Sequence, residues 1–232
     1  MTDHTVKAYD AELKKLSDTI THMAELTKSQ FKRSMKCIED WDFESAEQIV
    51  AEDDIIDDIE NDLYDFAVRM LALRQPMAGD LRNIIAALKI STDIERIADY
   101  AANAAKRAVL MKKASKIDLA GLIPELGTLA LQMFESVIEA FLDKDMEKAV
   151  AVWQSDNVLD QKYTDAYLQL IRHMEKNKKD IAVCTQLLFI AKSIERTGDH
   201  TTNIAETIYY SIRGKTLTSE RAAKLDIEDN II

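Results

Sequence analysis

Ile94-Glu95-Arg96-Ile97-Ala98-Asp99 and Ile194-Glu195-Arg196-Thr197-Gly198-Asp199 are two forms of one motif, and their spacing decides the fold. The two stretches match at an offset of 100 residues. Upstream of Pro76 the match continues at an offset of 103 residues, with residues 40–46 over residues 143–149. A loop near Pro76 accommodates the change of offset. Self-similarity at a fixed spacing indicates that the chain is a tandem duplication of one structural unit.

Apolar residues at helical spacing predict three long helices in each copy. Asp42 and Asp145 follow the first helix of each copy and are suited to cap the second, because their side chains accept hydrogen bonds from free backbone N–H groups. Long helices joined by short loops pack as antiparallel neighbours. We therefore predict an all-α fold of two pseudo-symmetric three-helix bundles, with six helices at about residues 5–39, 43–74, 80–112, 122–142, 146–176 and 180–214.

The predicted division of the chain follows the two copies. Residues 1–113 form the first three-helix repeat, 114–121 a linker, 122–214 the second repeat and 215–232 a polar C-terminal tail. Apolar residues in the tail are the ones able to dock on the bundles, namely Leu217, Leu225 and Ile227.

Composition supports this fold class and limits the functions. Five Gly and two Pro among 232 residues are too few for a β-sandwich or a Gly-rich α/β fold. The formal net charge of -11 argues against broad binding to nucleic acid or anionic lipid, without excluding a local basic patch. Cys37 and Cys184 lack CxxC spacing and are expected to be free buried thiols in a reducing compartment. No uncharged apolar run approaches the ~20 residues of a membrane helix, so we expect a cytoplasmic protein without an integral membrane segment.

Acidic residues lie where the apolar stripe of the third helix should continue. Ile84 and Leu88 define a buried stripe that leads to Glu95 and Asp99. The second helix and the second copy repeat this D/E-x-x-x-D pattern on their inner faces. Carboxylates at i and i+4 repel unless a cation lies between or beside them. The eight candidate metal ligands are Asp53, Asp57, Glu95 and Asp99 in the first copy and Asp156, Asp160, Glu195 and Asp199 in the second.

Two interpretations of these pairs stay open. Buried carboxylates either bind metal or pair with Arg96, Arg196, Arg82 or a lysine in an ordinary polar seam. Oxygen ligands favour Mg²⁺, Mn²⁺ or Ca²⁺ and also accept iron; the sequence does not distinguish Mg, Mn, Fe or Zn. Asn103 and Asn203 lie one turn beyond each motif, where an amide either hydrogen-bonds a ligand carboxylate or joins two helices.

Two further residues of the second copy modify the motif. Gly198 replaces Ala98 of the first copy at a cost of about 1 kcal/mol in helix propensity, which indicates close contact of the backbone with a neighbouring helix. His200 points about 100° away from Asp199, so we expect it at the surface or between helices rather than on a metal. The Glu-x-x-His pairs of ferritin-like di-iron enzymes are absent.

The duplicated E-R-x-x-D motif, with the Asp53-x-x-x-Asp57 and Asp156-x-x-x-Asp160 pairs, resembles the PhoU family of bacterial phosphate-uptake regulators. The likeness extends from about Tyr9 to Arg213, and the second copy, with Gly198 and His200, is closer to the family pattern. The resemblance implies metal bound at the motif carboxylates and a homodimer.

The resemblance further implies a cytoplasmic, non-enzymatic negative regulator of phosphate uptake and phosphate-starvation signalling. Its partners would be the ATPase subunit of the phosphate ABC transporter and the phosphate sensor histidine kinase, which would bring it to the inner membrane peripherally. The sequence agrees with a non-enzyme, because it supplies no nucleophile with a base, no P-loop and no Rossmann glycine pattern. A metal-dependent helical enzyme and a plain structural bundle are the alternatives.

Overall fold

The computed structural model describes residues 2–52 and 54–218, and side chains from residue 9 onward within these ranges. These residues are helical, with no strand among them, so the predicted all-α class is confirmed. The elements in chain order are α1 Thr2–Asp40, α2 Phe43–Ala51, α3 Asp54–Arg74, α4 Ala78–Leu110, η1 Asp118–Gly121, α5 Leu122–Asp143, α6 Met146–Lys176, η2 Lys178–Asp180 and α7 Ile181–Arg213.

The predicted helix over residues 43–74 is two helices, α2 and α3, whereas its counterpart α6 is continuous. Glu52 is the C-cap of α2 and leaves the helical geometry at ψ 3. Its carboxylate pairs with Arg33 of α1 at 2.5 Å, and α3 starts with the acidic first turn that a helix N-terminus favours. The second helix of the first repeat thus ends at Glu52, a residue that is paired with α1, and a new helix begins at Asp54.

The predicted caps are confirmed in both repeats. Asp42 accepts a hydrogen bond from the backbone N–H of Ser45 at 3.1 Å, and Asp145 accepts one from Lys148 at 2.9 Å. The helix ends also follow the sequence, because α3 stops before Pro76, where Gln75 adopts a left-handed φ of 47°. Local sequence thus sets most helix boundaries.

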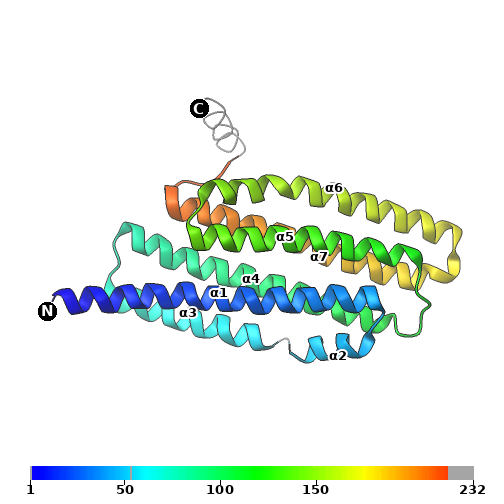
Figure 1. Cartoon of the computed structure of the whole chain (residues 1–232), viewed down its shortest axis with the longest axis horizontal. Helices are drawn as coiled ribbons and strands as arrows, with labels where there is room; N and C mark the ends of the chain where they lie inside the picture. Colours follow the sequence, from blue (N-terminus) through cyan, green and yellow to red (C-terminus); the bar gives the residue numbers. More distant parts are fainter. Residues whose placement is uncertain (1, 53, 219–232) are drawn as a thin grey trace.

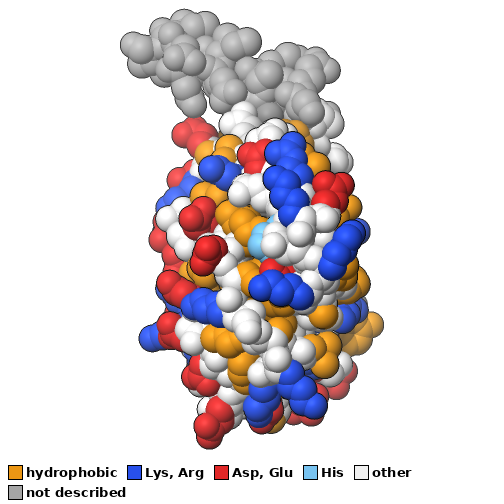
Figure 2. Space-filling model, turned by 90° about the vertical axis from the view of Figure 1, so that its right-hand side faces the viewer, with side chains coloured by type: hydrophobic (Ala, Val, Ile, Leu, Met, Phe, Trp, Pro, Cys, Tyr) orange, Lys and Arg blue, Asp and Glu red, His pale blue; other side chains and the backbone are white. Residues whose placement is uncertain are grey.

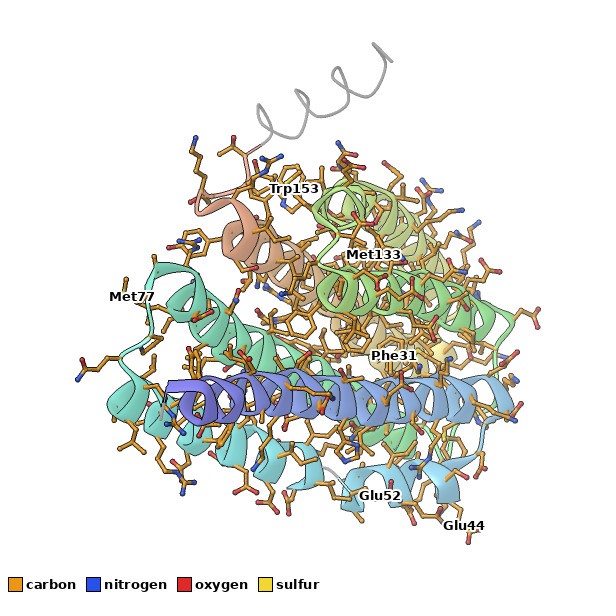
Figure 3. The ribbon with its side chains drawn as sticks, turned by 60° about the vertical axis from the view of Figure 1, so that its left-hand side comes forward. Phe31, Glu44, Glu52, Met77, Met133 and Trp153 are labelled. Atoms are coloured by element: carbon orange, nitrogen blue, oxygen red, sulfur yellow. The ribbon has the colours of Figure 1, made fainter. Side chains whose placement is uncertain are left out.

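The central pair of helices joins the repeats (Figure 1). α4 packs along α7, α1 and α5 pack against this pair, α2 and α3 flank α4, and α6 flanks α7. Phe31 of α1 and Met133 of α5, labelled in Figure 3, belong to one hydrophobic core that contains residues of both repeats. This shared core holds the two bundles together. The exact boundaries of the repeats, the linker and the tail stay a prediction.

Buried residues outside the motifs match two further predictions. Cys37 and Cys184 are free and buried. Leu217 packs against Val150 and Tyr209, so the first apolar residue of the tail docks on the second repeat. Asp53, Leu225 and Ile227 lie outside the described residues.

Phe31→Ala is expected to destabilise the protein by about 3–5 kcal/mol, because the ring is only 2% exposed and its loss leaves a cavity in the shared core. Urea unfolding followed by circular dichroism measures the change. Phe189→Ala is the matched control, since this ring is 49% exposed and its main described contact is the guanidinium of Arg107 at 4.4 Å, so its loss should cost about 1 kcal/mol or less. Equal losses in the two variants would contradict the core described here.

Candidate metal centre

The first acidic cluster lies between α3 and α4. Asp57 extends from the first turn of α3, and Glu95 and Asp99 extend from successive turns of α4. One oxygen of each of the three carboxylates lies within 4.8 Å of the others. Among the described residues, this group is the one whose carboxylates converge closely enough to share an ion. The structure thus brings together three of the four ligands predicted for the first repeat, and Asp53 is the one that lies outside its description.

Burial makes the charge of Glu95 costly. The residue is 9% exposed, and its burial, followed by the nearby charge of Asp99, raises its pKa to about 7. Arg96 opposes this rise, with its guanidinium 3.4 Å from Glu95 and 3.1 Å from Asp99. The ion-pair interpretation of the carboxylate pairs is therefore correct in part, because Arg96 pairs with two of the three carboxylates.

The second cluster lies between α6 and α7, at the corresponding place in the second repeat. Asp156 contributes an oxygen, Oδ1, that is enclosed and has no hydrogen-bond partner. Burial is the main cause that raises the pKa of Asp156 to about 6, and the charges of Asp160, Asp199 and Glu195 add to it. Asp160 itself is exposed. An enclosed carboxylate oxygen without a donor is a position suited to a proton or a cation.

Gly198 allows α6 to approach α7 at this cluster. A Cβ on Gly198 would lie 2.5 Å from Cδ2 of Leu159 and 2.9 Å from Oδ1 of Asp156. Both distances are too short for a real contact, so the close backbone contact predicted from this glycine is confirmed. The glycine makes room for the same aspartate that the metal hypothesis uses.

Basic side chains differ between the clusters. Arg196 lies 3.1 Å from Asp199, as Arg96 does from Asp99, but Lys192 adds an ion pair of 2.5 Å with Glu195. Lys192 was not among the residues predicted for the site. Alignment of the repeats at the offset of 100 residues could have identified it, since this alignment places Lys192 where the first repeat has the uncharged Thr92.

Asn203 and His200 make contacts away from the carboxylate ligands. Asn103 and Asn203 are both exposed, and Asn203 donates to Asp93 of α4 at 3.4 Å. His200 is hydrogen-bonded to the same carboxylate at 2.8 Å, and its ring centroid is 5.7 Å from that of Tyr100. His200 therefore joins α7 to α4, in agreement with the interhelix position predicted for it.

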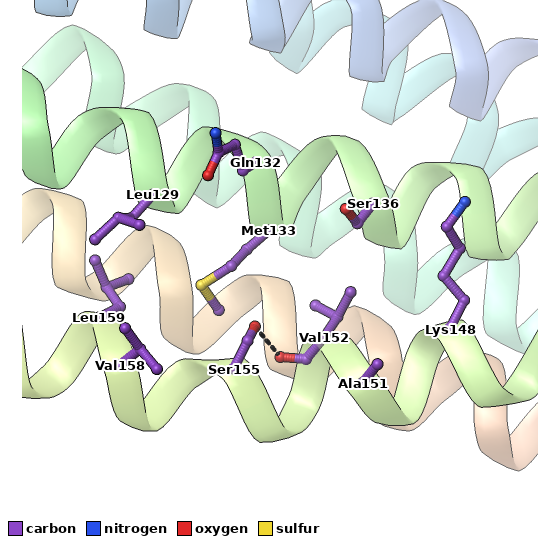
Figure 4. Close-up of a pocket in the computed structure, with 10 residues that line it drawn as sticks. All are labelled: Leu129, Gln132, Met133, Ser136, Lys148, Ala151, Val152, Ser155, Val158 and Leu159. Atoms are coloured by element: carbon purple, nitrogen blue, oxygen red, sulfur yellow. Dashed lines mark hydrogen bonds between the residues drawn. The ribbon is translucent and has the colours of Figure 1, made fainter.

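A groove between α5 and α6 is a further feature that could hold a ligand (Figure 4). Its walls are mainly apolar, and the hydroxyl of Ser155 donates to the backbone oxygen of Val152 at 2.7 Å. Ser136 and Ser155 line this groove. The first repeat has Arg33 and Glu52 at the corresponding positions, and these two residues form an ion pair. The groove lacks acidic residues, so it offers no carboxylate ligand for a metal ion. Its lining residues are Leu129, Gln132, Met133, Ser136, Lys148, Ala151, Val152, Ser155, Val158 and Leu159.

Comparison with known proteins agrees with the duplicated motif. A family model described as the PhoU domain matches residues 20–108 and again residues 123–208. The chain belongs to the PhoU family. It is 40% identical over 228 residues to the phosphate-specific transport system accessory protein PhoU homolog of Caulobacter vibrioides, a match that covers 98% of this chain and 99% of that protein. A homolog of the same name from Xylella fastidiosa is 38% identical over 228 residues, a match that covers 98% of this chain and 96% of that protein.

Solved structures of PhoU proteins have the same fold. The crystal structure of PhoU from Pseudomonas aeruginosa superimposes with a TM-score of 0.86 at 31% identity and covers 89% of this chain and 100% of that one. The crystal structure of the phosphate transport system regulatory protein PhoU from Streptococcus pneumoniae gives a TM-score of 0.85 at 27% identity. The match covers 90% of this chain and 99% of that one. These matches support a role for the PhoU fold of this chain in the regulation of phosphate transport.

The helices and one face of the surface bear on two other kinds of partner, a bilayer and a nucleic acid. None of the described helices is long and apolar enough to span a bilayer. On the face shown in Figure 2, Lys and Arg side chains are interspersed with acidic and apolar ones and form no continuous basic patch. This face therefore lacks the concentrated positive charge that binding to a nucleic-acid backbone needs.

Metal-free protein is expected to become more stable as the pH falls from 8 towards 5. Folding raises the pKa of Glu95 from about 4.5 to about 7, so the folded state binds this proton more tightly than the unfolded state does. The resulting stabilisation is complete below pH 4.5 and is lost as the pH rises through 7.

Urea unfolding at several pH values in the presence of EDTA tests this. Glu95→Gln removes the titrating group and should reduce the pH dependence by up to about 3 kcal/mol. Glu25→Gln is the control, because the Glu25 side chain is 60% exposed. A wild-type slope that Glu95→Gln leaves unchanged would show that this carboxylate titrates normally.

Proposed function

We propose that this chain is a negative regulator of phosphate uptake and of phosphate-starvation signalling, and that it acts in the cytoplasm as an adaptor. The observation that carries the proposal is its likeness, over 98% of its length, to proteins named as accessory to the phosphate-specific transport system. Its partners are the ATPase subunit of the phosphate ABC transporter, which brings it to the inner membrane peripherally, and the phosphate sensor histidine kinase. The active form is a homodimer.

Metal held by the acidic clusters is the second part of the proposal. Asp53, Asp57, Glu95 and Asp99 bind in the first repeat, and Asp156, Asp160, Glu195 and Asp199 bind in the second. The convergence of Asp57, Glu95 and Asp99 and the unpartnered oxygen of Asp156 support this set. Carboxylate oxygens suit Mg²⁺, Mn²⁺ or iron, and Zn²⁺ accepts them as well. A bound ion neutralises the clusters and fixes α3 to α4 and α6 to α7.

A regulatory role without catalysis fits the surroundings of the clusters. The candidate metal ligands are the carboxylates of the two clusters. His200 is hydrogen-bonded to Asp93 on the neighbouring helix rather than to one of these carboxylates. A hydrolase or oxidase needs a further acid, base or redox ligand beside the metal. The adaptor therefore uses the ions to set the positions of its helices, and its partners read the resulting surface.

Repression of phosphate-starvation genes tests the function in cells. Deletion of the gene should raise a phosphate-starvation reporter in phosphate-rich medium by at least about tenfold, and the wild-type gene should restore repression. Asp99→Ala combined with Asp199→Ala should fail to restore it, because each cluster loses a ligand. Asp62→Ala combined with Asp165→Ala is the control, since these aspartates are exposed and occupy equivalent positions in the repeats. Unchanged reporter levels after deletion would refute the proposed function.

Thermal unfolding of the purified protein tests metal binding directly. Mn²⁺ at 100 times its dissociation constant should stabilise the folded state by about 2.7 kcal/mol per site through mass action. The increase in Tm should disappear in the Asp99→Ala, Asp199→Ala variant and persist in the Asp62→Ala, Asp165→Ala control. A similar increase in the variant and in wild type would place the ion elsewhere.

A further inference from the structure

A cleft lies where the two repeats meet, between α1, the start of α4 and the C-terminal ends of α5 and α7. Its volume is about 520 Å³. The floor consists of Leu16, Ala86, Ala87 and Ile208, which are 2–4% exposed. Pockets of this size between helices, lined mainly by apolar side chains, are typical binding sites. The cleft is therefore large enough and apolar enough to bind side chains of a second molecule.

The corresponding place at the opposite end of the molecule is filled. The repeat offsets place Trp41 over Lys144 and Met111 over Ser211, and the lysine and the serine line the cleft. Trp41 packs against the core, and its ring nitrogen donates to the backbone oxygen of Ala114 at 3.4 Å. Met111 is 1% exposed. Large apolar side chains thus occupy at one end the space that is open at the other.

The difference between the two places lies in the side chains rather than in the backbone. Trp41 and Lys144 share a left-handed backbone, with φ of 60° and 53°. Leu187, which is fully buried, corresponds to Ala87 in the floor of the cleft. The chain itself therefore shows that this kind of cleft accepts Trp, Met and Leu side chains.

Two apolar side chains project from the turn between α3 and α4, toward the end of the molecule that carries the cleft (Figures 1 and 3). Leu73 is 77% exposed and Met77 is 81% exposed, the highest values for large apolar side chains among the described residues. The repeat offsets place Lys176 and Asn177 at these positions in the second repeat, so such a turn does not require apolar residues. We call Leu73 and Met77 the knob.

The turn that carries the knob is held in place. Arg74 donates two hydrogen bonds to the carboxylate of Glu12 on α1, at 2.7 and 2.9 Å. Pro76 restricts the backbone directly before Met77. A knob on a restrained turn loses little conformational freedom when it binds, which favours association.

We propose that the knob of each copy inserts into the cleft of a second copy, so that two equivalent contacts about a two-fold axis close the homodimer. This inference rests on the homodimer in the proposed function. In a two-fold dimer each surface patch of one copy meets the complementary patch of the other, and both contacts form together. The knob and the cleft lie toward the same end of the molecule, as such a pair of contacts requires.

The chemistry of the knob and of its surroundings fits a second copy. Its Leu and Met side chains are of the same types as Leu187 and Met111, which fill the corresponding place within the chain. Asp80 lies in the first turn of α4, directly after the knob, and Lys144 lies at the rim of the cleft. Insertion brings these opposite charges to the same interface. An anionic bilayer is a poorer target for the knob, because the net charge of -11 repels it.

Sedimentation equilibrium of the full chain tests the knob. Leu73→Ala with Met77→Ala should raise the dissociation constant of the dimer at least about a hundredfold, because the loss occurs at both symmetric contacts. Leu110→Ala is the matched control and should leave the constant unchanged, since Leu110 is 64% exposed at the opposite end of α4.

Filling the cleft from within tests the other side of the contact. Lys144→Trp with Ser211→Met copies the filled end of the molecule and should also raise the dissociation constant at least about a hundredfold. The left-handed backbone at Lys144 accepts this change, because Trp41 has the same conformation. Unchanged helical circular dichroism checks that both double variants are folded.

Mixing the two double variants tests insertion directly. The knob variant keeps its cleft and the filled variant keeps its knob, so neither homodimer has a contact but a heterodimer regains one. Native mass spectrometry of the mixture should therefore show heterodimers, with a dissociation constant at least about tenfold below that of either homodimer.

Each contrary result refutes a different statement. A dimer that neither double variant weakens, or a mixture without preferred heterodimers, would overturn the knob and cleft while the homodimer itself stood. A monomeric wild type would overturn the homodimer and this inference together. Regulation of phosphate uptake is measured separately by the reporter in cells, so its failure is distinguishable from both.

Discussion

A negative charge enclosed between helices requires a proton or a cation, and this requirement governs the structure around both clusters. Glu95 and Asp156 project from helix faces that otherwise carry core residues. Water reaches these carboxylates poorly, and each lies among other carboxylates that disfavour its ionisation. Arg96 and Lys192 supply part of the positive charge. Metal would supply the rest at neutral pH, and protons do so as the pH falls.

The duplicated fold determines where these charges lie. Each cluster draws its carboxylates from the second and third helical positions of a repeat, and the third helices α4 and α7 pack on each other. A change in the spacing of α3 and α4 at the first cluster therefore acts on a helix that also contacts the second repeat. Close-packed interiors transmit such displacements because they contain few voids. The arrangement suits a protein whose output is the shape of its surface.

The sequence predicts the fold well because its signals are local or repeated. Asp42 and Asp145 act through backbone groups three residues away, and the repeat supplies a second copy of most helix boundaries. The end of α2 at Glu52 escaped prediction because residues 48–57 contain no Gly or Pro to mark a helix end. Helical periodicity also gave the direction of Glu95 and Asp99. It says nothing about which neighbour a long side chain reaches, so the ion pair of Lys192 with Glu195 and the contacts of Asn203 required coordinates.

A duplicated site best tolerates sequence divergence at the exposed or half-exposed positions beside its carboxylates, such as Thr92 and Lys192. The motif carboxylates, Gly198 and the helix caps are tied to packing, and substitutions there disturb the scaffold as well as the site. Thr92 is exposed and Lys192 is half exposed, so exchange between such residues alters local charge at little cost in packing. The second repeat accordingly carries an ammonium beside Glu195, whereas the first repeat has the Thr92 hydroxyl hydrogen-bonded to Glu60 at the corresponding place.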